Sequence, residues 1–222
     1  MEARELRRIA RENLAGNWGN AVLAAFLAVL LGGLLTEGGN FSLDIDSEYL
    51  EHFPESAKVL LASVASFAGT LNLVHFILGG VVRQGYAVYL LKQYDRRNPQ
   101  TNDLFSQFDR FGDGFCLKFL ENLFVVLWSL LLIFPGIVKS YAYAMAPFIM
   151  AENPEMTARQ ALRASEELMD GHKADLFFLE LSFIGWGILN IFTLGIGSFW
   201  LNPYMNAARA AFYRNLSYVS VE

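Results

Sequence analysis

The chain has 222 residues, of which 54% are hydrophobic and 18% charged, with a mean hydropathy of +0.32 and a net charge of −5. Soluble domains carry about a quarter charged residues, so this composition excludes an ordinary water-soluble protein and favours an integral membrane protein. A single cysteine, Cys116, excludes a disulfide framework and any CxxC metal or redox site. The fold class that we expect is all-α: a polytopic membrane helix bundle of about six transmembrane helices in three hairpins, preceded by an amphipathic helix.

The N-terminal residues 1–18 are predicted to form a cytoplasmic amphipathic helix at the membrane surface. The i, i+3, i+4, i+7 spacing that lines up one helical face is occupied by Arg4, Arg7, Arg8 and Arg11. Such a stripe can bind anionic lipid headgroups, so these four residues are candidate headgroup contacts. The alternative is an ordinary positive-inside anchor with no specific ligand.

Residues 19–222 are predicted to form one membrane domain that begins with a hairpin. Its first spans are expected at about 19–36 and at 57–82, the second extending as a helix to 94. A helix over 57–94 is about 57 Å long, far more than a bilayer core. It must therefore tilt, break at Gly79-Gly80 or project into the cytoplasm, and we favour projection.

The segment between these two spans carries the net negative charge. Residues 37–56 hold six of the 22 acidic residues and no Lys or Arg, which leaves 16 acidic against 17 basic residues elsewhere. Because Lys and Arg collect in cytoplasmic loops, we expect an external loop here. An EF-hand that began at Asp44 would need Gly where Tyr49 stands, so a solvated acidic loop is favoured over a calcium site. Nucleic-acid binding needs a basic face, so no nucleic-acid partner is expected.

Two glycine-containing turns predict the other hairpins. Pro135-Gly136 is a strong turn signal and separates spans at 115–134 and 136–151, with Pro147 expected to kink the second. The turn Gly195–Gly197 separates spans at 174–194 and 197–214. The intervening cytoplasmic segments are 95–114 and 152–173.

The second cytoplasmic segment has the signals of a helix, since Thr157 and Gln160 form a capping-box pattern and Gly171 is a natural residue just past the end. Six spans place both termini in the cytoplasm. A five-span alternative would leave Arg209 and Arg214 outside, against the positive-inside rule.

An ordered series of motifs over residues 131–213 resembles a known family. The longest runs from Leu132 to Pro147 and reads LIFPGIVKSYAYAMAP. Further stretches are Asn153-Pro154, 169–173 (MDGHK), 181–186 (LSFIGW), 193–197 (TLGIG), Asn202-Pro203-Tyr204 and Phe212-Tyr213, with weaker agreement at Asn17-Trp18-Gly19. The series resembles the DUF975 family of bacterial integral membrane proteins, of unknown function and found mostly in Gram-positive bacteria. Asp170 stands where many members have Lys, which weakens the case for a basic phosphate grip there.

No catalytic motif is present: HExxH, GxSxG, the Walker loop and the Rossmann glycine pattern are all absent from the sequence. We therefore expect no enzyme activity and no cofactor. Three scattered histidines do not predict a metal site, and His75 is favoured as a hydrogen-bonded intramembrane residue over a ligand.

Ionisable residues near membrane depth are the better candidates for a site. Glu121 and Glu180 enter corresponding spans, each close to an inner-side lysine, Lys118 or Lys173. These carboxylates, with Tyr141, Tyr143 and Tyr204, are the candidate lining of a polar inner vestibule for an ion, lipid headgroup or small solute. The alternative is that the charges lie at the interface and pair without function.

The adjacent His172 and Lys173 complete the candidate headgroup contacts, although a helix end followed by positive-inside residues explains them as well. The function that we expect is non-catalytic, exerted in the cell membrane through lipids, some of them anionic, or through a protein partner or a second copy. The alternative is a transporter or channel with a polar inner vestibule, which the broken helices support. A membrane enzyme has the least support.

Overall fold

The computed structural model describes residues 2–32, 54–131, 133–193 and 195–219, and within these ranges the chain is all-α. Most of the predicted external loop, residues 37–53, lies outside the described residues. Two short 3-10 turns, Thr101–Phe105 and Phe108–Arg110, precede α5. The α-helices are α1 (Ala3–Leu14), α2 (Trp18–Leu30), α4 (Glu55–Tyr94), α5 (Phe111–Leu131), α6 (Ile133–Tyr143), α7 (Ala146–Glu152), α8 (Ala158–Leu168), α9 (Lys173–Leu181), α10 (Ile184–Phe192) and α11 (Ser198–Val219).

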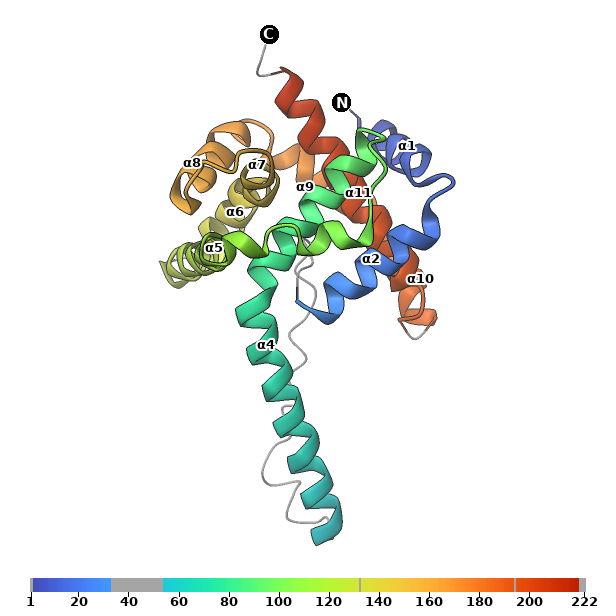
Figure 1. Ribbon diagram of the computed structural model, residues 1–222, viewed down its shortest axis with the longest axis vertical. Coiled ribbons are helices and arrows are strands. Elements are labelled where there is room, and N and C mark those ends of the chain that lie inside the picture. The colour runs from blue at the N-terminus through green and yellow to red at the C-terminus, as the bar shows by residue number, and fades with distance from the viewer. Residues whose placement is uncertain (1, 33–53, 132, 194, 220–222) are drawn as a thin grey trace.

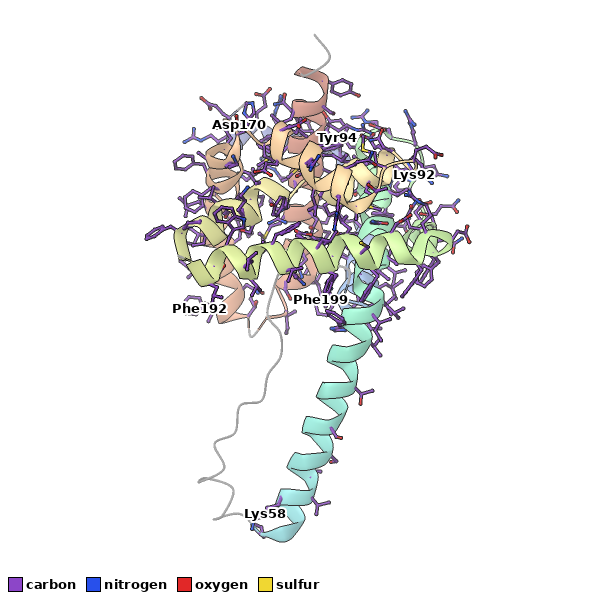
Figure 2. The ribbon with its side chains drawn as sticks, turned by 90° about the vertical axis from the view of Figure 1, so that its left-hand side faces the viewer. Lys58, Lys92, Tyr94, Asp170, Phe192 and Phe199 are labelled. Carbon is purple, nitrogen blue, oxygen red and sulfur yellow. The ribbon has the colours of Figure 1, made fainter. Side chains whose placement is uncertain are left out.

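Helix α4 is the central column of the molecule. Its 40 residues span about 60 Å. The C-terminal half is enclosed by the other helices, while the N-terminal half leaves the body and extends away from the other described helices towards Lys58 (Figures 1 and 2). The core forms around the enclosed half, where Tyr86, Tyr89 and Leu90 are buried in one cluster with alanines of α2 and α11. The half that leaves the body is thus the N-terminal one, whereas the projection expected from the sequence concerned the C-terminal end, up to residue 94, which is largely buried.

Helix α4 is not broken at Gly79-Gly80. These two glycines and Gly85 leave its surface free of side chains where other segments pack closely. A Cβ atom on Gly80 would lie 2.3 Å from the carbonyl oxygen of Gly114 at the start of α5, and one on Gly85 would lie 2.0 Å from that of Leu104. Backbones can approach this closely only where side chains are absent. The glycines thus fix where α5 and the 3-10 turn Thr101–Phe105 rest on α4.

Helices α5 and α6 form an antiparallel hairpin that lies across the direction of α4 (Figure 2). Gly136 faces Ser129 so closely that a Cβ atom on Gly136 would lie 2.0 Å from Ser129 Oγ, and the rings of Tyr143 and Phe124 are 6.2 Å apart. The expected turn at Pro135-Gly136 is displaced, because α6 already begins at Ile133. Proline is tolerated in the first helical turn, where its missing N–H has no intrahelical acceptor.

Breaks and caps elsewhere follow the local sequence. The predicted return helix is divided into α6 and α7, with Pro147 in the first turn of α7. Helix α8 begins with the predicted capping box, in which the Thr157 amide donates to Gln160 Oε1 at 2.8 Å. A bend near Ser182 separates α9 from α10, and Gly195, with φ +85°, lies in the turn before α11.

The N-terminal helix is shorter than expected and packs on protein. Helix α1 ends at Leu14, and the axis of α2, which starts at Trp18, is bent by 104° from that of α1. The apolar face of α1, with Leu6, Ala10 and Leu14, is buried mainly against α11. This face is therefore covered by the protein itself.

Two described segments are long and apolar enough to cross a membrane, namely Val74–Tyr94 and Lys173–Phe192, and a third is added if the bent α1–α2 pair is one broken span. Six parallel spans are thus not established by length and composition. Helix α1 and the C-terminal end of α11 lie at the same end of the body (Figure 1).

Candidate functional site

A buried ion pair joins α4 to α5. Arg83 donates to both carboxylate oxygens of Glu121, at 2.6 and 3.2 Å, and each side chain is only 7% exposed. Nearby, Lys118 donates to the carbonyl oxygens of Gly32 and His75. Two charges removed from water need a close, well-aligned partner, and the two-point contact supplies one. The candidate carboxylate of Glu121 is therefore held inside the helix packing.

The second candidate carboxylate, Glu180 on α9, joins three helices. It forms an ion pair with Arg209 of α11 and accepts a hydrogen bond of 2.7 Å from the Tyr141 hydroxyl of α6. Arg209 and Glu180 are 12% and 21% exposed. This cluster does bring together two of the predicted residues, Glu180 and Tyr141.

The remaining vestibule candidates lie in other surroundings. Tyr143 packs against Phe124 and near Lys139 on the α5–α6 hairpin, and Tyr204 donates to the carbonyl oxygen of Arg7 at 3.3 Å. The lysines expected beside the two carboxylates have other contacts: Lys173 pairs with Asp170 at 3.5 Å. The five candidates are thus distributed over separate clusters.

A third charged cluster, which sequence reasoning missed, ties the polar ends of α4, α7 and α11. Arg214 forms ion pairs with Asp95 and Glu152, and the Tyr213 hydroxyl donates to Glu152 at 2.6 Å. Burial alone would lower the pKa of Arg214, but Glu152 and Asp95 outweigh it and raise that pKa. Arg214 therefore stays charged, and its two ion pairs connect the ends of the three helices. These partners are more than 60 residues apart in the chain, so no local spacing could have found them.

The predicted headgroup contacts at the N-terminus are mixed with acidic residues. Arg4 lines an open hollow together with Glu2 and Asp175, and Arg8 lies 3.7 Å from Glu12. Arg11 is exposed. Arg7 is turned into the protein, where it donates to the Ser182 carbonyl oxygen at 2.9 Å and lies over the Phe183 ring.

His172 and Lys173 likewise have acidic partners. His172 lies 3.1 Å from Asp175, and Asp170 pairs with Lys173. His75, expected to be a hydrogen-bonded residue, has its Nε2 2.7 Å from the carbonyl oxygen of Leu30. The described residues contain no group of three or more His, Cys, Asp or Glu side chains placed to hold a metal ion.

One groove stands out for its positive charge. It lies between α8 and the α5–α6 hairpin, has a volume of about 420 Å³, and we call it the basic groove. Its lining is Phe124, Tyr143, Arg159, Leu162, Arg163 and Glu166. Lys139 borders it, since it forms an ion pair with Glu166 and lies 5.3 Å from the centre of the Trp128 ring.

Large apolar side chains are exposed on four helices of the body, and we call this set of residues the apolar belt. Helix α10 has no buried residue, and α5 exposes a stripe at helical spacing opposite its buried face. Phe192 and Phe199 lie low on the body, whereas Lys92, Tyr94 and Asp170 lie towards the opposite end (Figure 2). The belt comprises Leu23, Phe26, Val29 and Leu30 of α2, Phe119, Leu123, Val126, Leu127 and Leu130 of α5, Phe134, Ile137 and Val138 of α6, and Ile184, Trp186, Ile188, Leu189, Ile191 and Phe192 of α10.

A comparison of the chain with models of protein families tests the resemblance that the motifs suggest. The model of one family, described as a protein of unknown function (DUF975), matches residues 1–139 and 130–220. The chain belongs to the DUF975 family. The matched residues include the three ion-pair clusters and the basic groove. Neither the curated proteins nor the solved structures contain a match to the chain.

Proposed function

We propose that this DUF975 protein is an integral protein of the cytoplasmic membrane that acts without catalysis, through lipids or a protein partner. The apolar belt is the observation that carries the proposal. Contiguous exposed apolar patches larger than a few hundred Å² are rare on soluble monomers and mark membrane or protein contacts. An all-exposed apolar helix such as α10 would be strongly disfavoured in water.

The orientation follows from the distribution of charge. Polar residues and the ends of α1 and α11 are at one end of the body, and the apolar belt and the free half of α4 are towards the other (Figures 1 and 2). The positive-inside rule favours the end with Arg96, Arg97 and Arg214 as the cytoplasmic one. In this orientation α4 crosses the membrane, and the acidic segment 37–56 is external.

The proposal differs from six parallel spans at one hairpin. Helix α5 lies across α4 (Figure 2), so the two cannot both follow the membrane normal. We infer that the α5–α6 hairpin inserts from the cytoplasmic side with its exposed stripe in lipid and does not cross. Its tip, near Phe134, then stays within the membrane.

Cysteine labelling on intact cells tests this arrangement. On a Cys116→Ala background, we expect an impermeant maleimide to label Ser47→Cys and not Ser220→Cys, because only the first is external. Phe134→Cys, at a side chain that is 82% exposed on the protein, should stay unlabelled, although six parallel spans would place it outside. Labelling of Ser220→Cys, or release of the protein from membranes by alkaline carbonate, would reject the proposal. Labelling of Phe134→Cys would restore the six-span arrangement.

The partners follow from the same surfaces. Arg4, Arg8 and Arg11 lie on the exposed side of α1, where anionic headgroups can reach them. A protein partner or a second copy is the alternative occupant of the apolar belt. Identification of the lipids and proteins that co-purify with the chain by mass spectrometry distinguishes these partners.

A transporter is the second candidate, and the Glu180 cluster favours it. Ionisable groups on an otherwise apolar membrane segment mark ion or substrate pathways in many proteins, and Glu180 lies within Lys173–Phe192. If the cluster serves transport, purified protein in liposomes should carry ions or small solutes, and Glu180→Gln should abolish the flux while the protein stays folded. No flux with the unmodified protein would reject transport.

A further inference from the structure

The basic groove holds two positive charges that the protein leaves uncompensated. Arg159 and Arg163 are four residues apart on α8, so both point from the same face of the helix into the groove. Within the described ranges, neither guanidinium has an ion pair or a hydrogen bond to the protein. Glu166 is the acidic residue of the lining, and its charge is balanced by Lys139. The groove is therefore positive overall.

The shape and walls of the groove suit a small charged group attached to something apolar. Its volume of about 420 Å³ is in the range of small-ligand sites. Phe124, Leu162 and the ring of Tyr143 provide apolar wall. Planar guanidinium groups bind phosphate through paired, charge-assisted hydrogen bonds, so a phosphate ester is the anion that two adjacent arginines fit best.

The groove also lies beside the apolar belt. Phe124 lies on α5 one helical turn before Leu127, which is exposed and belongs to the belt. Lys139 and Trp128 stand at the edge of the groove with the ammonium group over the indole ring, a pair of residue types that gather at the membrane–water interface. A ligand with its phosphate on the arginines therefore has an apolar surface within reach.

We propose that the basic groove binds the phosphate headgroup of an anionic phospholipid, whose acyl chains lie along the exposed stripe of α5. The inference rests on the proposed insertion of the hairpin into the membrane. Inorganic phosphate offers the same contacts to the two arginines, but it lacks the chains that the apolar stripe would cover. A zwitterionic lipid has the chains and the phosphate, but its positive choline group opposes the arginines.

Titration of the detergent-solubilised full chain with short-chain phosphatidylglycerol, phosphatidylcholine and inorganic phosphate tests the proposal. We expect phosphatidylglycerol to bind tightest of the three. Arg159→Gln with Arg163→Gln should weaken its binding by about tenfold or more, because charge-assisted hydrogen bonds are lost. The matched control is Arg96→Gln with Arg97→Gln, which removes two exposed charges from the loop after α4 and should leave the affinity unchanged.

Several outcomes would overturn the inference. These are equal affinity of the unmodified protein for the two lipids, equal affinity for inorganic phosphate, or an equal loss of affinity in both double variants. The comparison of the three ligands needs no variant, so it decides even if the double variant fails to fold. A protein that resists carbonate extraction but shows no preference for phosphatidylglycerol would reject the groove and keep the proposed membrane function.

Discussion

Replacement of Glu121 by Gln is expected to lower the stability of the protein more than any other single polar substitution proposed for it. Removal of one partner from a buried ion pair leaves an uncompensated charge, at a cost of about 3–5 kcal/mol. For a chain of this size that corresponds to a fall in the unfolding midpoint on the order of 10 °C. Arg83→Gln should have a similar effect, since the two side chains are equally buried. The measurement is the thermal unfolding midpoint in detergent.

The control is a salt bridge of the same charge type at the surface. Arg8 and Glu12 are 62% and 54% exposed, so Arg8→Gln should change stability by less than about 1 kcal/mol. The double variant Arg83→Met with Glu121→Leu should regain part of the lost stability, because apolar replacement of a buried pair is often neutral. If Glu121→Gln and Arg8→Gln unfold at the same temperature, the Arg83–Glu121 pair does not hold α4 and α5 together.

Replacement of Gly85 by Ala is expected to destabilise the protein by about 1–3 kcal/mol, the usual cost of overpacking. The added methyl group would lie 2.0 Å from the Leu104 carbonyl oxygen, and a backbone atom cannot move aside as a side chain can. The 3-10 turn Thr101–Phe105 would have to shift away from α4. The unfolding midpoint and the yield of folded protein measure the effect.

Gly187→Ala in α10 is the matched control. A Cβ at Gly187 meets no atom within 4 Å, and Ala favours the helix over Gly by about 1 kcal/mol. This variant should be as stable as the unmodified protein or more stable. A Gly85→Ala protein as stable as the Gly187→Ala protein would show that the close contact between α4 and the turn is not needed.

Local sequence was enough to predict the helices and many of their ends. The apolar composition and the long charge-free runs indicated an all-α chain, and the capping box at Thr157 and the glycine turn before α11 lie where the sequence placed them. Such signals are local because a cap or a turn involves residues within about four positions of one another. The motif series likewise identified the family, which the family model confirms.

Predictions from local sequence were wrong where a glycine or a proline can have either of two structural roles. Gly79-Gly80 was a candidate break in the helix, but the pair is part of the flat face on which α5 rests. Pro135 was expected to form the tip of the hairpin, but it lies in the first turn of α6. Glycine and proline have these two roles in any sequence, and only the neighbouring helix decides between them.

The partners of the charges were decided by the tertiary structure alone. Spacing on one helix face associated Glu121 with Lys118, yet the carboxylate binds Arg83, 38 residues away, and Glu180 binds Arg209 rather than an inner lysine. The two arginines of the basic groove became notable only when α8 was placed over the hairpin. The sequence by itself determined that the chain is helical, apolar and a member of its family. Which charges meet depends on how the helices pack, because a buried charge selects the partner that packing brings close and not the nearest one along the chain.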